Sequence, residues 1–318
     1  MSRLARASLS QRHLTRAQFL RLCAAVSMTA LLPELACAGA RKTAAISSRP
    51  IPSTGELLPV VGCGTYRGFD HAPGSEEYAR LADIVKALLD SGGSVLDSAA
   101  IYGRSEQSLG EILSADGLRD RVFLAGKVWS TGREEGIAQM EESMRDMRTD
   151  RLDLMQVHNL VDWRVQLATL RRWKMEGRFR YIGITHYLSS AHEAVEAVLR
   201  SEPVDFLQIN YSMDENNAAQ RLFPLCAERG IAVLINRPFG GGGLMRQLRG
   251  KPLPGWAGEI KCSSWAQILL KFVLSQSAVT CVIPGTGNPA HMQDNVRAGF
   301  EPFPEPAFWK SKQLPLTG

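Results

Sequence analysis

The chain has 318 residues, 45% of them apolar, and carries 37 lysines and arginines against 32 aspartates and glutamates. That is enough apolar chain to bury the core of one large domain or of two small ones. Residues 1–40 hold five of the basic and one of the acidic residues, so 32 basic residues remain against 31 acidic ones. This near balance gives no electrostatic reason to expect nucleic acid or an acidic membrane as a partner.

Residues 1–40 are predicted to be a signal peptide that is removed from the mature protein. An arginine-bearing start precedes an apolar run of about 11 residues, which is too short for a membrane span of roughly 20. Small residues offer cleavage sites after Ala38 or Ala40. The segment TRAQFLR resembles a bacterial twin-arginine export signal, with Ala17 where the second arginine belongs. We therefore expect a periplasmic protein; an uncleaved leader on a cytoplasmic protein is the alternative.

The cysteines indicate neither a disulfide framework nor a metal site. Two of the six fall in the predicted signal peptide. The other four are far apart and include no CxxC pair, namely Cys63, Cys226, Cys262 and Cys281. We expect buried free thiols. Cysteine and histidine show no zinc-ligand spacing, so no metal is expected.

The predicted elements begin with a short hairpin, in which residues 50–52 and 57–60 flank a turn that contains Gly55. From there strands alternate with helices. Strands are expected at 60–66, 95–97, 122–127, 152–158, 181–185, 206–210, 231–236 and 279–284. The helix that follows each of them is expected at 76–89, 106–113, 134–147, 165–175, 189–199, 218–229, 264–274 and 290–298.

Eight strand–helix units in about 250 residues are the count of a closed α/β barrel, the (β/α)8 or TIM barrel. An open doubly wound sheet is the alternative, but Gly62-Cys63-Gly64 matches only the first half of the GxGxxG fingerprint. No internal repeat or linker interrupts the pattern. We therefore expect one domain over residues 50–300 and a proline-rich tail over 301–318 that covers one rim or is disordered.

Polar residues stand at the C-terminal ends of three consecutive predicted strands, where a barrel of this kind builds its active site. These are Asp97, Lys127 and His158, and Tyr102 follows Asp97 on the next loop. A lysine that closes an apolar strand is costly to bury unless a carboxylate pairs with it, and Asp97 is one strand away. The ammonium group would lower the pKa of Tyr102 from about 10 and make it a proton donor at neutral pH. His158 adds a hydrogen-bonding group for a substrate oxygen.

In their order and spacing, several segments of the chain resemble the aldo/keto reductases. They are LDSAAIYGRSEQSLG, FLAGKV, DLMQVH, YIGITH, DFLQINY and VIPGTGNPAHMQDN. The resemblance covers roughly residues 50–300 and implies a (β/α)8 barrel that transfers hydride between a nicotinamide dinucleotide and a carbonyl or alcohol. By the same resemblance, Tyr102 would protonate the carbonyl oxygen and Lys127 would depress the tyrosine pKa. Asp97 would hold Lys127, and His158 would orient the carbonyl.

The resemblance also implies cofactor contacts. Thr185 and His186 stand where the family often has Ser-Asn at the nicotinamide amide, and Gln208 matches its third amide ligand. Asn236 replaces a tyrosine that many members stack on the ring. The phosphates would meet backbone N–H groups of small residues, although the glycines at 240–243 also fit a mobile loop. The implied set is Gly64, Thr65, Tyr66, Asp97, Thr185, His186, Gln208, Asn236, Arg237, Gly240, Gly285, Thr286, Asn288, His291 and Asn295.

NADP(H) is the favoured cofactor, with NAD(H) as the alternative. Many members hold the 2′-phosphate of NADP with a lysine and an arginine, and this chain has Gly285 and His291 at those positions. Thr286 and Asn295 remain as polar contacts.

The expected function is NAD(P)H-dependent reduction of an aldehyde or ketone, with a small carbonyl compound as the substrate. Tyr66, Trp129 and Asn159 are expected to line the substrate pocket, whose aromatic walls suit an apolar compound. A nucleotide-binding redox sensor or partner subunit on the same barrel is the alternative, although such a protein would not need Tyr102 as a proton donor. The sequence does not indicate an oligomeric state.

Overall fold

Eight parallel strands form the centre of the structure, a computed structural model that describes residues 46–312. The predicted signal peptide and its cleavage sites lie outside the described residues. Neighbouring strands pair in the order β10-β9-β8-β7-β6-β5-β4-β3, and bridges from Val61 to Val282 and from Gly64 to Gly285 join the two edges. This confirms the predicted (β/α)8 barrel. The strands are β3 (Cys63–Gly64), β4 (Val95–Asp97), β5 (Phe123–Val128), β6 (Leu152–His158), β7 (Phe179–Thr185), β8 (Phe206–Asn210), β9 (Ala232–Asn236) and β10 (Val279–Val282).

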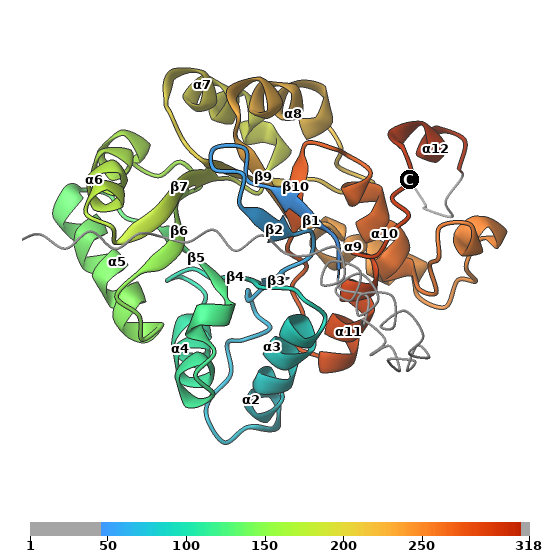
Figure 1. The fold of residues 1–318 in the computed structure, drawn as a ribbon, viewed down its shortest axis with the longest axis horizontal. Helices are drawn as coiled ribbons and strands as arrows, with labels where there is room; N and C mark the ends of the chain where they lie inside the picture. Colours follow the sequence, from blue (N-terminus) through green and yellow to red (C-terminus); the bar gives the residue numbers. More distant parts are fainter. Residues whose placement is uncertain (1–45, 313–318) are drawn as a thin grey trace, which may run out of the picture. The chain divides into compact units, whose positions relative to one another are not determined.

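Helices surround the barrel, as Figure 1 shows. The helix predicted at 76–89 is divided at Arg80 into a first segment that buries no residue and a second segment that buries six. The helix predicted at 189–199 begins with a 3₁₀ turn over Ser189–Ala191. The helices are α2 (Glu76–Ala79), α3 (Leu81–Asp90), α4 (Ser105–Ala115), α5 (Arg133–Asp146), α6 (Trp163–Met175), α7 (His192–Ser201), α8 (Ala218–Arg229), α10 (Trp265–Leu274) and α11 (Pro289–Arg297).

The predicted hairpin closes the N-terminal end of the barrel. It consists of β1 (Ser48–Pro50) and β2 (Leu57–Pro59), which pair antiparallel and lie in front of the barrel strands in the view of Figure 1. Ile51 and Leu58 are buried in one cluster with the apolar side chains that fill the barrel, among them Phe123, Tyr181 and Phe206. These three rings lie 5.4–6.0 Å apart. The lower half of the barrel is therefore a packed core.

Two short helices were not predicted, because neither is long enough to show helical periodicity. α9 (Gly243–Leu248) follows a 3₁₀ turn over Gly240–Gly242 in the predicted glycine-rich loop. α12 (Pro306–Lys310) lies in the predicted tail, where the ring of Trp309 packs 5.5 Å from that of Phe272 on α10. This part of the tail covers the outside of the barrel.

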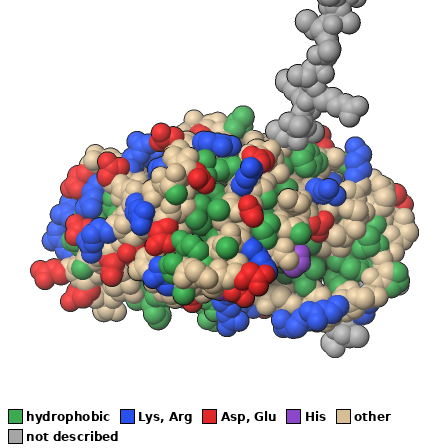
Figure 2. Space-filling view, turned by 90° about the horizontal axis from the view of Figure 1, so that it is seen from below, with side chains coloured by type: hydrophobic (Ala, Val, Ile, Leu, Met, Phe, Trp, Pro, Cys, Tyr) green, Lys and Arg blue, Asp and Glu red, His purple; other side chains and the backbone are tan. Residues whose placement is uncertain are grey.

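The cysteines agree with the prediction, since Cys63, Cys226, Cys262 and Cys281 are buried free thiols. Within residues 46–312, no helix has the length and apolar content of a membrane span, and no cluster of side chains could hold a metal ion. On the face shown in Figure 2, acidic and basic side chains are interspersed.

Helix α4, which follows the loop that carries Tyr102, packs closely against the end of α5 at Gly110. A Cβ atom there would lie 2.1 Å from the carbonyl oxygen of Asp146. We predict that Gly110→Ala lowers the free energy of unfolding by about 1–3 kcal/mol, because the helices must move apart. Urea unfolding followed by circular dichroism measures the change.

Gly255→Ala is the matched control. A Cβ atom at Gly255 would meet nothing within 4 Å, and its φ is not left-handed. Its effect should stay within about 0.5 kcal/mol. Equal midpoints for both variants would contradict the close approach of α4 and α5.

Candidate active site

The four predicted catalytic residues lie together at the C-terminal end of the barrel. Asp97 ends β4, Lys127 is the penultimate residue of β5, and His158 ends β6. These three side chains are buried, with exposed fractions of 3%, 1% and 6%. Tyr102 lies half-buried on the turn after β4. Parallel strands bring these ends to one rim, which is why residues up to 61 positions apart meet there.

The buried lysine is paired as predicted. Lys127 Nζ lies 2.5 Å from Asp97 Oδ2 and also donates to the Ser98 carbonyl at 2.7 Å. Asp97 Oδ1 accepts from Gln208 Nε2 at 2.8 Å and from Gln156 Nε2 at 3.2 Å. Both carboxylate oxygens are therefore satisfied, which a buried ion pair requires. Gln156 was not predicted, although the two-residue period of a strand places it on the same face of β6 as His158.

The predicted direction of the Tyr102 pKa was wrong. Burial raises the pKa of Tyr102 above its ordinary value of 10, and this effect exceeds the lowering by the Lys127 charge and hydrogen bond. Asp97 adds to the increase because it offsets the lysine charge. Lys127 Nζ lies 5.0 Å from the centre of the Tyr102 ring. The phenol is thus fully protonated at neutral pH. Once the proton leaves, the nearby Lys127 ammonium group stabilises the phenolate.

Lys127 is held in its charged form and His158 in its neutral form. Burial alone would lower the pKa of Lys127, but Asp97 and Tyr102 together raise it above its ordinary value, so the amine is charged. Burial, followed by the charges of Lys127 and His186, lowers the pKa of His158 to about 3, so its imidazole is neutral. The His158 ring meets the Tyr102 ring edge-on at 6.0 Å. A neutral imidazole beside a phenol is a hydrogen-bonding site for an uncharged oxygen.

A cavity of about 720 Å³ opens above these groups. It brings together most of the predicted site, with Lys127 beneath its floor. Aromatic and apolar side chains form its mouth, among them the exposed Tyr66, Trp129 and Tyr187. The predicted residues that line it are Gly64, Thr65, Tyr66, Asp97, Tyr102, Trp129, His158, Asn159, Thr185, Gln208, Asn236, Arg237 and Gly285.

Sequence reasoning missed several lining residues that adjoin predicted ones, and adjacency was the only available signal. They are Arg67, Ile101, Tyr187, Pro238, Phe239 and Ile283, whereas Gly241 and Gly242 belong to the glycines at 240–243 that were expected near the phosphates. Six predicted cofactor residues lie outside the cavity lining, namely His186, Gly240, Thr286, Asn288, His291 and Asn295. Four of them belong to the loop after β10 and to α11, where Asn288 caps the helix by accepting from the Ala290 N–H at 2.9 Å.

Three of the predicted cofactor-binding residues, Thr185, Gln208 and Asn236, form a connected group on one wall. Thr185 Oγ1 donates to Gln208 Oε1 at 3.3 Å, and Asn236 Nδ2 lies 3.4 Å from the same oxygen. Asn236 also donates to the His186 carbonyl at 3.1 Å. The His186 ring stacks on Tyr187, and its Nδ1 accepts from the Leu188 N–H. His186 therefore does not line the cavity but holds the Asn236 side chain through its backbone carbonyl.

The same wall continues along backbone that carries glycines. A Cβ atom on Gly64 would lie 3.1 Å from the Ile283 carbonyl oxygen. Gly241 and Gly242 have left-handed φ values of 62° and 87°. Glycines at these positions leave the backbone bare of side chains along the cavity, while the N–H groups of Gly64 and Gly242 donate to the Pro284 and Phe239 carbonyls. Arg237 lies beside them and forms no ion pair with any of residues 46–312.

A model of the aldo/keto reductase family matches residues 60–313. The chain belongs to the aldo/keto reductase family. It is therefore an NAD(P)-dependent oxidoreductase that acts on carbonyl or alcohol groups.

Curated relatives and solved structures agree with this assignment. The methylglyoxal reductase YeaE of Escherichia coli is 28% identical over 246 residues, which cover 75% of this chain and 84% of the relative. A Klebsiella pneumoniae aldo-keto reductase in complex with NADPH has a TM-score of 0.67 at 23% identity, covering 80% of this chain and 89% of its own. The holo form of a Bacillus halodurans aldo-keto reductase has a TM-score of 0.65 at 22% identity, covering 80% and 90%. The two structures show that the fold is shared.

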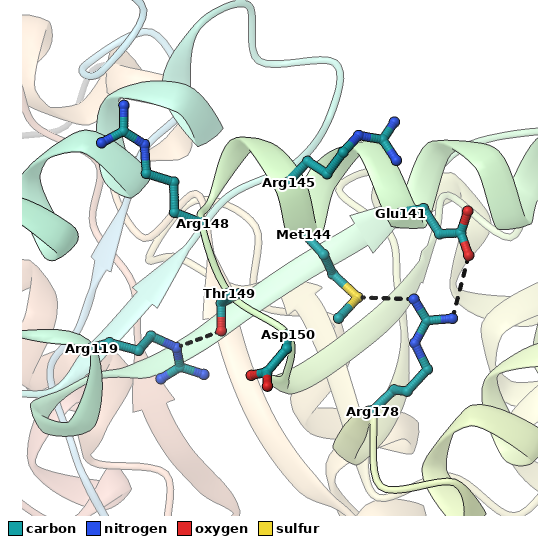
Figure 3. A pocket seen from close by; sticks show the side chains of 8 residues that line it. All are labelled: Arg119, Glu141, Met144, Arg145, Arg148, Thr149, Asp150 and Arg178. Atoms are coloured by element: carbon teal, nitrogen blue, oxygen red, sulfur yellow. Dashed lines mark hydrogen bonds and ion pairs between the residues drawn. The ribbon is translucent and has the colours of Figure 1, made fainter.

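A second pocket of this aldo/keto reductase lies at the opposite end of the barrel, near the N-terminal ends of β5, β6 and β7 (Figure 3). Four arginines line it, and two of them connect neighbouring segments of the chain. Arg119 donates to Thr149 Oγ1 at 3.1 Å, and Arg178 lies over the Trp173 ring and pairs with Glu141. The pocket contains no residue of the predicted site.

Glu106 is a buried carboxyl group in the first turn of α4, inside the segment that carries Tyr102. Its exposed fraction is 3%, and its Oε1 atom has no partner among the described residues. Burial raises the pKa of Glu106 to about 7, although Ser143 and Lys127 each lower it. In the unfolded chain the same group titrates near 4.5. The folded protein therefore binds this proton more tightly than the unfolded chain does.

We predict that Glu106 makes the aldo/keto reductase less stable as the pH rises from about 4.5 to 7. In this window the folded state keeps the proton and the unfolded state has lost it, so unfolding becomes more favourable. The free energy of unfolding of Glu106→Gln, taken relative to wild type, should therefore be on the order of 2–3 kcal/mol higher at pH 8 than at pH 5. Urea unfolding at both pH values measures the difference.

The exposed Glu134 provides the control, since Glu134→Gln should keep the wild-type dependence on pH. A wild-type pH dependence in Glu106→Gln would show that Glu106 does not titrate in this window.

Proposed function

We propose that this aldo/keto reductase reduces aldehyde or ketone carbonyls to alcohols with NADP(H), with Tyr102 as the general acid. One observation carries the proposal: a protonated phenol lies between a buried Lys127–Asp97 ion pair and a neutral His158, on the floor of one open cavity. A redox sensor would have no use for this arrangement of a proton donor with a charge to stabilise its conjugate base.

The substrate oxygen would lie between the Tyr102 hydroxyl and the His158 ring. His158 stays neutral at physiological pH, so it orients the carbonyl without adding a charge that would compete with Lys127. Tyr102 then gives its proton to the oxygen as negative charge develops there. Lys127 stabilises the resulting phenolate, and Asp97 with its two glutamine partners keeps the ammonium group in position. A bound nicotinamide supplies the hydride.

NADP(H) is the proposed cofactor. The glycines along the cavity leave room for a nucleotide, and Arg237 offers positive charge for its phosphates. Relatives of the same fold were solved with this nucleotide, including the Klebsiella pneumoniae protein with NADPH and the Bombyx mori protein with NADP. Methylglyoxal, named for the Escherichia coli relative, is a first substrate to test.

We predict that Tyr102→Phe lowers kcat for carbonyl reduction by about 10²- to 10⁴-fold, the usual contribution of a general acid. NADPH oxidation with methylglyoxal and a panel of aldehydes measures the rate. Tyr187→Phe removes a hydroxyl from the same cavity and is the matched control, expected within about twofold of wild type. Equal rates for wild type and Tyr102→Phe would refute the mechanism. Nucleotide binding without turnover in wild type would favour the sensor.

The cofactor preference makes a separate prediction. Quenching of tryptophan fluorescence should show that NADPH binds at least about tenfold more tightly than NADH, a difference of 1.4 kcal/mol from the added phosphate. Tyr102→Phe should bind NADPH as wild type does, since the phosphate contacts lie elsewhere. Equal affinity for NADPH and NADH would refute the proposed preference for NADP(H).

A further inference from the structure

Tyr102 lies on the turn over residues 98–104, which connects β4 to α4. Its backbone N–H donates to the Ala99 carbonyl at 2.9 Å, and its carbonyl accepts from the Ser105 N–H at 3.1 Å. α4 begins at Ser105, and the side chain of the preceding residue, Arg104, makes no capping hydrogen bond. The N–H groups at the start of a helix need acceptors from outside it. The Arg104 N–H therefore needs an acceptor from another part of the chain.

Asp70, on the loop that follows β3, provides that acceptor. Its Oδ1 atom accepts from the Arg104 N–H at 2.9 Å. Its carboxyl group also lies against Gly103, where a Cβ atom would overlap it. Gly103 has a left-handed φ of 57°, so both the backbone conformation and the close approach of Asp70 favour glycine there. The carboxyl group thus contacts the two residues that directly follow Tyr102.

The segment from Thr65 to Asp70 is anchored at two further points. At its start, Thr65 Oγ1 donates to Ser98 Oγ at 2.9 Å, at the beginning of the turn. Near its end, Phe69 is fully buried, and its carbonyl accepts from Ser108 Oγ of α4 at 3.0 Å. The segment therefore contacts the turn both before and after the tyrosine, and Asp70 is held by a neighbour that is itself fixed in the core.

We infer that Asp70 is a positioning residue for the general acid and holds the turn where the Tyr102 hydroxyl reaches the substrate oxygen. The inference rests on the proposed function. Asp70 acts through the backbone of the turn, so it needs an acceptor oxygen and not a negative charge. Proton transfer requires donor and acceptor at hydrogen-bond distance, and a displacement of about 1 Å can lower a rate about 100-fold. Asp70 does not line the cavity, so binding of substrate and nucleotide should not depend on it.

Three variants test the inference with the carbonyl substrate that wild type reduces fastest. Asp70→Ala removes the acceptor and should lower kcat about tenfold, with KM and NADPH affinity within about twofold of wild type. Asp70→Asn keeps an oxygen at the position of Oδ1 and should retain kcat within about twofold. Asp83 is an exposed aspartate of α3, and Asp83→Ala is the matched control, expected to match wild type. NADPH oxidation gives kcat and KM, and fluorescence quenching gives the affinity.

A double-mutant cycle with Tyr102→Phe separates positioning from general damage. If Asp70 acts through the Tyr102 hydroxyl, Asp70→Ala should change kcat less than about twofold in the Tyr102→Phe background. A solely structural role would lower kcat equally in both backgrounds.

Four results would overturn the inference and leave the reductase assignment intact: equal losses in both backgrounds, an unchanged kcat in Asp70→Ala, a tenfold loss in Asp70→Asn, or loss of NADPH binding in Asp70→Ala. A different result tests the proposed function. If Tyr102→Phe alone keeps the wild-type kcat, the proposed mechanism fails and the inference with it.

Discussion

The buried ion pair between Lys127 and Asp97 is the constraint on which the active site depends. Two charges in an apolar barrel are stable only if every remaining polar atom is paired. Here the partners come from four strands, with Asp97 on β4, Lys127 on β5, Gln156 on β6 and Gln208 on β8. The ion pair therefore fixes the relative positions of these strand ends, and the cavity above it inherits that geometry.

Burial and charge act against each other at Tyr102. A stronger acid would need a lowered pKa, yet partial burial of the phenol disfavours its anion, and the pKa of Tyr102 is raised. The result favours a donor that keeps its proton until a substrate oxygen draws it away. Lys127 then contributes most at the moment of transfer, because its charge meets a developing phenolate instead of a resting one.

The barrel, the four clustered residues and most of the cavity lining could be predicted from sequence, because strand ends and the family motif are local signals. The pKa direction of Tyr102 could not, since it depends on how fully the phenol is buried and on how well Asp97 cancels Lys127. Gln156 and Arg67 were missed for a related reason. Each looks like an ordinary strand or loop residue until the closed barrel brings it to the site. The short helices α9 and α12 lack the length to show a period.

The hairpin β1–β2 affects how substrate enters the cavity and how product leaves it. With Ile51 and Leu58 packed into the apolar interior, the barrel is filled from below. The cavity above Asp97 and Lys127 is then a dead end, and whatever enters at the aromatic mouth leaves by the same opening. Substrate therefore enters and product leaves through the same opening, so product must be released before the next substrate can bind.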